Sequence, residues 1–304
     1  MSEPVVLHAG EARVALAPAV GGSIAAFEWR GHPVLRPTPQ FALAAQEVRE
    51  TCCYPLVPYS NRIRNAHLHF GGRDHRLERN FGDHPHAIHG VGWQRSWIAA
   101  HVAATTARLD LDHAPNGSDA RAWPWAFAAS QHFALSSSDA GTTTLTMTLR
   151  IANRSAEPFP FGLGWHPYFV KGAQTRLRFA AAGAWLTDAT VLPVRHVPIH
   201  AQWDFAGSRE VCDLRIDNVF TGFAGEAVLD DVALPFTTHL EGDSASTYLV
   251  VYTQPQLDCI AIEPVTHLTD SFNRSDAGET ANGTRVLAPG GQFSCTMRVI
   301  VRPR

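Results

Sequence analysis

The chain has 304 residues, of which 45% are hydrophobic and 17% charged, a composition typical of a globular protein with a large core. Its formal net charge of −3 does not favour binding to nucleic acid or to an anionic membrane, because both require clustered basic charge. Five cysteines, with Cys52 and Cys53 adjacent, suit neither a disulfide framework nor a CxxC metal site.

The N-terminal sequence MSEPVVLHAG has no basic segment followed by a long apolar one, and therefore does not resemble a signal peptide. No apolar run in the chain reaches the roughly 18 residues that a membrane-spanning helix needs. We therefore expect a cytoplasmic protein.

Apolar and polar residues alternate with a period of two along much of the chain, which predicts β-strands. Residues 12–35 are predicted to form two strands joined at Gly21-Gly22, and the alternation recurs over 108–112, 144–151 and 293–301. Turns rich in Gly, Pro, Asn and Asp separate these segments. Helical periodicity is scarce, and residues 41–50 are the best short candidate. The pattern predicts one all-β domain over residues 1–304, a large antiparallel sandwich or barrel.

Two arginines lie in the segment 61–64, which is predicted to enter a hairpin that turns at Gly71-Gly72. Strand alternation would place Arg62 and Arg64 on one face, with Ile63 on the other. The guanidinium group offers five donors in a plane and suits a ligand with several oxygens. Solvated arginines on an exposed strand face are the alternative interpretation.

Three histidines at His84, His86 and His89 raise the question of a metal site, because His is the commonest metal ligand. Their spacing matches no familiar zinc pattern, and no Cys or acidic ligand completes it nearby, so no metal is predicted. His89 precedes Gly90 in a segment whose glycines would leave space beside the imidazole. Trp93 is either a core residue or a platform for a sugar ring.

The segment 161–170, FGLGWHPYFV, is predicted to form the floor of a binding cleft. One of its faces is apolar and suits a buried core; it carries Phe161, Leu163, Trp165 and Phe169. The other face carries His166 and Tyr168 beside Gly162 and Gly164. Glycine inside a strand often marks a place where a ligand or another backbone comes close. A core histidine with satisfied hydrogen bonds is the alternative.

Glu263 lies in an otherwise apolar segment, where it is predicted to face away from Ile260 and Ile262. A carboxylate in such a strand needs a partner or a function, because burying an unpaired charge is costly. A buried ion pair with an arginine is the alternative. Asp217-Asn218 is interpreted as a turn, because Asx side chains often bond their own backbone.

Five segments occur along the chain in the order NRIRNA, AIHGVGW, GWHPYF, DNVF and AIEPVTH. On the basis of these segments and their order, nearly the whole chain resembles the aldose 1-epimerase (galactose mutarotase) family. The resemblance implies a β-supersandwich with an open sugar cleft, and no metal or organic cofactor. It implies that His166 donates a proton to the sugar ring oxygen and that Glu263 takes the proton of the anomeric hydroxyl. Residues that match the family's sugar-holding positions are Asn61, Arg62, His89 and Asp217.

These roles fit the chemistry of anomer exchange on a free aldohexose. The C1–O5 bond must break, the aldehyde must turn about C1–C2, and the ring must close on its other face. A base on O1 and an acid on O5 avoid a free alkoxide and a free oxocarbenium ion, and each is typically worth about 10²–10⁴ in rate. Neutral pH then requires an ionised Glu263 beside a protonated His166, which a nearby carboxylate favours.

Two other functions stay open. An epimerase of a phosphorylated or otherwise anionic hexose would need a second arginine beside Arg62 in the cleft, from a supply that includes Arg64, Arg76, Arg79 and Arg95. A non-catalytic sugar-binding β-sandwich would need no acid/base pair. The segment after His89 reads GVGW where the best-known galactose enzymes of the family have a glycine pair, so the resemblance leaves the sugar open. A monomer and a homodimer are both compatible with the sequence.

Overall fold

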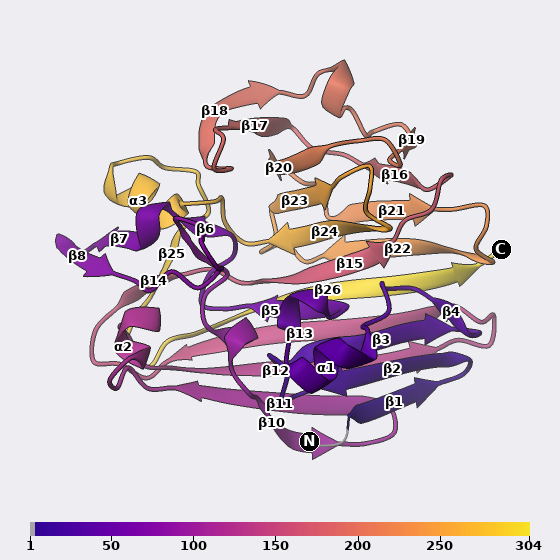
Figure 1. The fold of residues 1–304 in the computed structure, drawn as a ribbon, viewed down its shortest axis with the longest axis horizontal. Coiled ribbons are helices and arrows are strands. Elements are labelled where there is room, and N and C mark those ends of the chain that lie inside the picture. The colour runs from indigo at the N-terminus through magenta and orange to yellow at the C-terminus, as the bar shows by residue number, and fades with distance from the viewer. Residues whose placement is uncertain (1–3) are drawn as a thin grey trace.

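Two large antiparallel β-sheets form the frame of the computed structural model, which describes residues 4–304 (Figure 1). The first sheet contains eleven strands: β1 (Val5–Ala9), β2 (Ala12–Ala17), β3 (Ser23–Trp29), β4 (His32–Pro33), β5 (Cys53–Leu56), β15 (Gly164–Val170), β17 (Gly183–Thr187), β18 (Pro193–Pro198), β20 (Ile216–Thr221), β23 (Tyr248–Thr253) and β24 (Cys259–Val265). The second contains nine: β10 (Ile98–Val102), β11 (Thr106–His113), β12 (Phe127–Ser137), β13 (Thr143–Asn153), β16 (Arg176–Phe179), β19 (Arg209–Glu210), β21 (Glu226–Asp230), β22 (Phe236–Gly242) and β26 (Gln292–Pro303).

The remaining elements are small. Three two-stranded sheets pair β6 (Arg62–Ile63) with β9 (Ala87–Ile88), β7 (His67–Phe70) with β8 (Arg73–Arg76), and β14 (Phe159–Phe161) with β25 (Arg285–Leu287). The helices are α1 (Gln40–Ala45), α2 (Asp119–Ala122) and α3 (Ser271–Asp276), with 3₁₀ turns η1 (Val48–Glu50), η2 (Arg64–Ala66), η3 (Gly92–Gln94) and η4 (Ala201–Trp203). Within residues 4–304, no helix is long and apolar enough to cross a membrane.

The predicted all-β architecture of large antiparallel sheets is confirmed. In the first sheet the strand order is β1-β2-β3-β5-β15-β24-β23-β20-β17-β18, with β4 beside β3. This order places β15 and β24 next to each other near the middle of the sheet, although their residues are about a hundred positions apart in the sequence. The predicted helical segment 41–50 contains α1 and η1, which are separated at Gln46, a residue in the left-handed backbone region (φ +58°).

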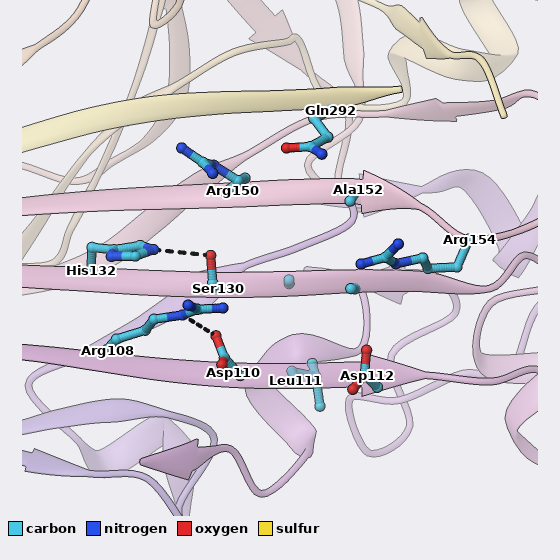
Figure 2. A pocket seen from close by; sticks show the side chains of 12 residues that line it. Arg108, Asp110, Leu111, Asp112, Ser130, His132, Arg150, Ala152, Arg154 and Gln292 are labelled. Atoms are coloured by element: carbon cyan, nitrogen blue, oxygen red, sulfur yellow. Dashed lines mark hydrogen bonds and ion pairs between the residues drawn. The ribbon is translucent and has the colours of Figure 1, made fainter. Parts of the chain in front are cut away.

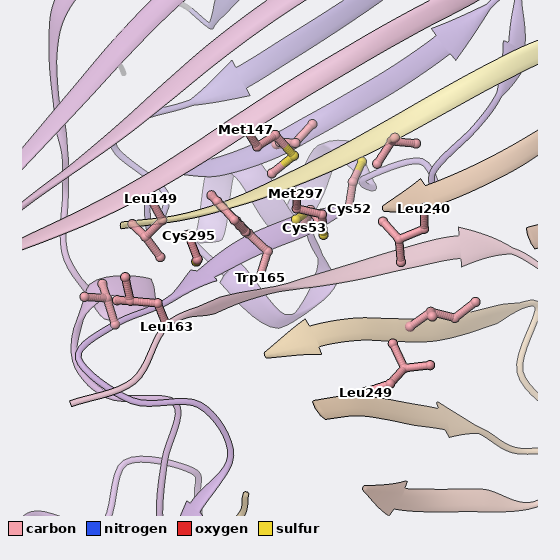
Figure 3. Close-up of a cluster of buried hydrophobic side chains, with 14 of the residues drawn as sticks. Cys52, Cys53, Met147, Leu149, Leu163, Trp165, Leu240, Leu249, Cys295 and Met297 are labelled. Carbon is pink, nitrogen blue, oxygen red and sulfur yellow. The ribbon is translucent and has the colours of Figure 1, made fainter. Parts of the chain in front are cut away.

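The two sheets pack against each other through their apolar faces. Met147 and Leu149 of β13 and Met297 of β26 belong to the same buried cluster as Trp165 of β15 and Leu249 of β23 (Figure 3). Each of these side chains is at most 1% exposed. Full burial of one such side chain is worth roughly 1.5–3 kcal/mol, so this interface contributes to holding the site strands in place.

The five cysteines are all free, in agreement with the absence of a disulfide framework in the sequence. Cys52, Cys53, Cys259 and Cys295 are buried. Burial raises the pKa of the Cys52 thiol to about 11, so this thiol stays protonated at neutral pH and is a poor nucleophile.

The predicted turn at Gly21-Gly22 joins β2 to β3, and both glycines have a positive φ. A Cβ on Gly21 would lie 2.2 Å from the Trp93 carbonyl oxygen, and one on Gly22 would meet the Trp97 ring at 2.6 Å. Only glycine satisfies both the backbone geometry and the close packing at this turn.

The glycines beside the predicted cleft residues make room for protein atoms, which corrects the interpretation that they leave space for a ligand. A Cβ on Gly162 would lie 1.7 Å from the His267 ring, and one on Gly164 would lie 2.7 Å from the Val265 side chain. A Cβ on Gly90 would lie 2.4 Å from the Val57 carbonyl oxygen. The predicted strand 161–170 is also interrupted, because β14 ends at Phe161 and β15 begins at Gly164.

The predicted common face of Arg62 and Arg64 is wrong. The strand β6 has only two residues and pairs with β9, while Arg64 begins the turn η2, in which Asn65 and Ala66 have positive φ. Strand alternation therefore ends at Ile63. The hairpin at Gly71-Gly72 does form, between β7 and β8.

The buried His267 side chain packs against Gly162 and makes hydrogen bonds through both ring nitrogens. Its Nε2 accepts a hydrogen bond from the Ser60 backbone N–H at 3.0 Å, and its Nδ1 lies 2.8 Å from the Leu268 carbonyl oxygen. This arrangement requires a neutral imidazole with its proton on Nδ1. Burial lowers the pKa of His267 to about 4.

We expect His267 to make the protein sensitive to acid. Its folded pKa is depressed, so its contribution to stability is complete above the ordinary His pKa and is lost as pH falls toward the folded pKa. From pH 7 to pH 5 this amounts to a loss of about 2 kcal/mol in the free energy of unfolding. Urea unfolding at both pH values, for the wild type and for His267→Gln, isolates the contribution. If the wild type and His267→Gln lost the same free energy of unfolding between pH 7 and pH 5, the predicted contribution of His267 would be contradicted.

Candidate active site

His166 and Glu263 face each other across two neighbouring strands near the middle of the first sheet. The antiparallel register pairs Gly164 with Val265 and Tyr168 with Ala261, which places residues 166 and 263 directly opposite. His166 Nε2 lies 3.2 Å from Glu263 Oε1, and the two side chains are only 9% and 2% exposed. Glu263, predicted to need a partner, therefore has a histidine as that partner.

The other polar atoms of this pair have no protein partner. His166 Nδ1 and Glu263 Oε2 are buried and make no hydrogen bond. A buried polar atom without a partner typically costs about 1–3 kcal/mol, so such atoms in a native structure call for an explanation. Two of them on one pair indicate a site built to bind something polar.

Burial sets the protonation of the pair. It raises the pKa of Glu263 well above its ordinary value, and the negative charge of Asp217 adds to this effect. It lowers the pKa of His166, with smaller effects of the same sign from Arg36 and Arg62. The expected ionised Glu263 beside a protonated His166 is therefore not the form that burial favours in the empty site. The favoured form is neutral, with one transferable proton between Oε1 and Nε2.

Aromatic rings hold the His166 imidazole in position. The Tyr54 ring stacks on it at 4.9 Å between centroids, and the Tyr168 ring lies 4.5 Å away. The register of β5 against β15 places Tyr54 directly beside His166. Trp93 lies behind Tyr54, with 5.9 Å between ring centroids. This packing limits the imidazole to one orientation.

Arg62 and Asp217 form the second half of the site. Arg62 Nη2 lies 3.5 Å from Asp217 Oδ2, and Arg62 Nη1 donates a hydrogen bond to Asn61 Oδ1 at 2.9 Å. Arg62 Nε is buried without a partner. Burial raises the pKa of Asp217, while Arg62 opposes this shift. The predicted turn at 217–218 is wrong, because both residues lie within β20, where the Asn218 side chain donates to the Trp185 carbonyl.

His89 completes the site as a hydrogen-bond donor. Its Nδ1 accepts a hydrogen bond from the Asn61 backbone N–H at 3.0 Å, and the His89 backbone N–H donates to the Asn61 carbonyl oxygen at 2.8 Å. The imidazole proton therefore lies on Nε2, and burial lowers the pKa of His89 well below its ordinary value. The His89 ring meets the His166 ring edge-on at 5.4 Å. All six predicted site residues are thus joined by successive contacts.

Comparison with known proteins identifies the family. The aldose 1-epimerase family model matches residues 3–299. The chain belongs to the aldose 1-epimerase family.

The chain is similar to other proteins over nearly its whole length. It is 29% identical to the uncharacterized Escherichia coli (strain K12) protein YphB over 290 residues, which span 92% of this chain and 93% of YphB. The solved structure of a candidate aldose 1-epimerase from E. coli K12 superposes with a TM-score of 0.87 and 26% identity, covering 99% of both chains. A GalM/aldose epimerase homologue from C. elegans shares the fold, with a TM-score of 0.80, 16% identity, and coverage of 99% of this chain and 98% of that one.

Two further residues lie at this candidate site without any local sequence pattern that indicates them, Tyr54 and Arg36. The Arg36 guanidinium lies over the Tyr168 ring, 4.3 Å from its centroid, and donates to the carbonyl oxygens of Arg49 and Thr51. Neither residue belongs to a local pattern with the predicted six. Only the pairing of β5 with β15 would have indicated Tyr54, and that pairing joins segments about a hundred residues apart.

The histidines His84 and His86 do not join His89 in a ligand set. His86 Nδ1 accepts from the Asn65 backbone N–H at 2.9 Å, and its Nε2 lies 3.0 Å from Thr190 Oγ1. Both ring nitrogens of His86 are therefore used within the protein. Burial lowers its pKa to about 4, which keeps the ring neutral.

A separate hollow lies on the outer face of the second sheet, where side chains of β11, β12 and β13 project together (Figure 2). Arg108 pairs with Asp110 at 2.7 Å, and Ser130 lies 3.3 Å from His132. None of the six predicted residues lines this hollow. The arginines of this hollow therefore do not belong to the candidate site around His166 and Glu263.

Proposed function

We propose that this protein is an isomerase that interconverts the α and β anomers of a free aldohexose by opening and reclosing the sugar ring. The observation that carries the proposal is the buried contact of 3.2 Å between His166 Nε2 and Glu263 Oε1. The two sugar oxygens that exchange protons, O1 and O5, are both bonded to C1. An acid and a base that touch each other are placed to reach both oxygens of one bound sugar.

In the proposed mechanism, the proton shared by the pair moves to His166 and leaves Glu263 as a carboxylate. Glu263 then accepts the proton of the O1 hydroxyl while the imidazolium of His166 donates a proton to O5. The C1–O5 bond breaks and C1 becomes an aldehyde. After rotation about C1–C2, O5 adds to the other face of C1, and both protons return along the same paths.

The remaining predicted residues would hold the sugar hydroxyls. Arg62 Nε and His89 Nε2 supply donors, because the former has no partner and the latter carries the ring proton. Asp217 and Asn61 supply acceptor oxygens. This mixture of donors and acceptors suits the hydroxyl groups of a neutral sugar, each of which both donates and accepts. The proposed mechanism uses no metal and no organic cofactor.

The anionic-hexose alternative depends on Arg36, the second arginine near His166. Its two Nη2 hydrogen bonds go to backbone carbonyls, and its Nη1 faces Cys259 Sγ at 3.8 Å. Arg62 is already paired with Asp217. Each guanidinium keeps only its Nε without a partner, while its Nη atoms already contact protein groups. One free donor on each is little for a phosphate, and this supports a neutral sugar as the substrate.

The test is anomer exchange measured by magnetisation-transfer NMR on galactose, glucose and glucose 6-phosphate. Exchange well above the buffer rate on a neutral sugar is the expected result. Exchange on the phosphate alone would favour the anionic alternative. Binding of a sugar without exchange on any of the three would favour a non-catalytic module.

We expect a broad pH plateau for kcat/KM of this exchange. A second proton on the pair creates a buried cation and the loss of its proton creates a buried anion, and burial disfavours both. The acid limb should therefore lie below the ordinary His pKa of about 6.5. Initial rates between pH 5 and pH 9 check this. An acid limb centred near pH 6.5 would show that His166 titrates as a solvated imidazole and would contradict the expectation.

A further inference from the structure

A second cluster of titratable side chains lies outside the candidate sugar cleft, on the hairpin formed by β7 and β8. His67 and His69 are two residues apart on β7, so both point to one face, while Leu68 points into the core. The register of the hairpin places Asp74 of β8 directly opposite His69. The turn between the strands is Gly71-Gly72.

Three ligand atoms of this cluster converge on one point. Asp74 Oδ1 contacts His69 Nε2 and lies 3.2 Å from His67 Nε2, and all three ligand atoms lie within 4.8 Å of one another. A tetrahedral cation with bonds of about 2.0–2.2 Å needs ligand atoms about 3.3–3.6 Å apart. Small side-chain rotations reach this spacing. Among the described residues, this is the one group of three or more His, Cys, Asp or Glu so placed.

Two side chains of α3, Asp276 and Asn273, lie next to the cluster. Asp276 Oδ2 lies 3.9 Å from His69 Nδ1, the nitrogen that faces away from Asp74. A carboxylate on the second nitrogen of a ligating histidine orients the ring and raises its basicity. Asn273 fixes β7 against α3, because its side chain accepts from the His69 backbone N–H and donates to the His67 carbonyl. In Figure 1, β7 and β8 lie beside α3 at one end of the molecule.

We propose that His67, His69 and Asp74 form a binding site for a divalent transition-metal ion. Two imidazoles and one carboxylate suit Zn²⁺, Ni²⁺ or Cu²⁺, whereas Mg²⁺ requires a shell of oxygen ligands. The three side chains are 32%, 48% and 57% exposed, so an ion reaches them directly from solvent. With three protein ligands, the fourth position is open to water. The site is independent of the His166–Glu263 pair and of the proposed mutarotase activity.

The experiment is isothermal titration of the untagged, chelator-treated full chain with Zn²⁺ and Ni²⁺, with Mg²⁺ as the negative control. We expect one equivalent of Zn²⁺ or Ni²⁺ to bind and no detectable Mg²⁺. His67→Ala, His69→Ala and Asp74→Asn should each weaken binding at least tenfold. Asp276→Asn should weaken it less, because this residue acts through His69.

His101→Ala is the matched control, because His101 is an exposed histidine on β10, outside the cluster. It should leave both stoichiometry and affinity unchanged. The thermal unfolding midpoint should rise with Zn²⁺ in the wild type and in His101→Ala, but not in Asp74→Asn, whose near-identical shape preserves the fold. The proposal is overturned if the cluster variants bind as the wild type does, or if His101→Ala loses affinity to the same extent.

Discussion

Replacing Glu263 by glutamine is expected to lower anomer exchange by at least about 100-fold, within the range typical of losing one proton-transfer group. The amide has the same shape as the carboxyl group and still contacts His166 Nε2, so the packing of the pair is preserved. It cannot accept the proton of the O1 hydroxyl or return it. Magnetisation-transfer NMR gives the exchange rate, and saturation-transfer difference signals report whether the sugar still binds.

The matched control for this substitution is Glu241→Gln. Glu241 lies on β22 in the other sheet, 3.6 Å from Arg298, and is one-third exposed. Exchange should be unchanged in this variant. Glu263→Gln should lose exchange but keep most of its sugar binding. Full exchange in Glu263→Gln would exclude this carboxyl group as the base.

Replacing Gly162 by alanine is expected to reduce the free energy of unfolding by about 3 kcal/mol or more, the upper part of the range for overpacking a buried site. The new Cβ would lie 1.7 Å from the His267 ring, which is itself fully buried. The ring would have to move and would lose its hydrogen bonds to Ser60 and Leu268. The φ of Gly162 is not in the left-handed region, so the cost is steric.

Gly207→Ala is the control for this prediction, because a Cβ at Gly207 meets nothing within 4 Å and its φ is also outside the left-handed region. That change should be close to neutral or slightly stabilising, because alanine restricts the unfolded chain. Urea unfolding at pH 7 measures both variants. Equal stability of the two would show that His267 can move at no cost.

Local patterns in the sequence determined the all-β character of the chain and the core-facing sides of β15 and β24. The alternation over 144–151 and 293–301 corresponds to β13 and β26, and the turns at Gly21-Gly22 and Gly71-Gly72 are present. Ile260 and Ile262 lie in the core opposite Glu263, as predicted. These features depend on neighbours a few residues away, so a single sequence records them directly.

The tertiary structure decided which residues meet and what charge they carry. The contact between His166 and Glu263, the stacking of Tyr54, and the ring of His267 beside Gly162 all join segments about a hundred residues apart. Alternation says which face a side chain occupies, but not which strand lies next to it. The protonation of the pair depends on complete burial, which a local pattern does not measure. Because a local pattern records only near neighbours in the sequence, it indicated the candidate residues, and the fold decided how they are arranged and how deeply they are buried.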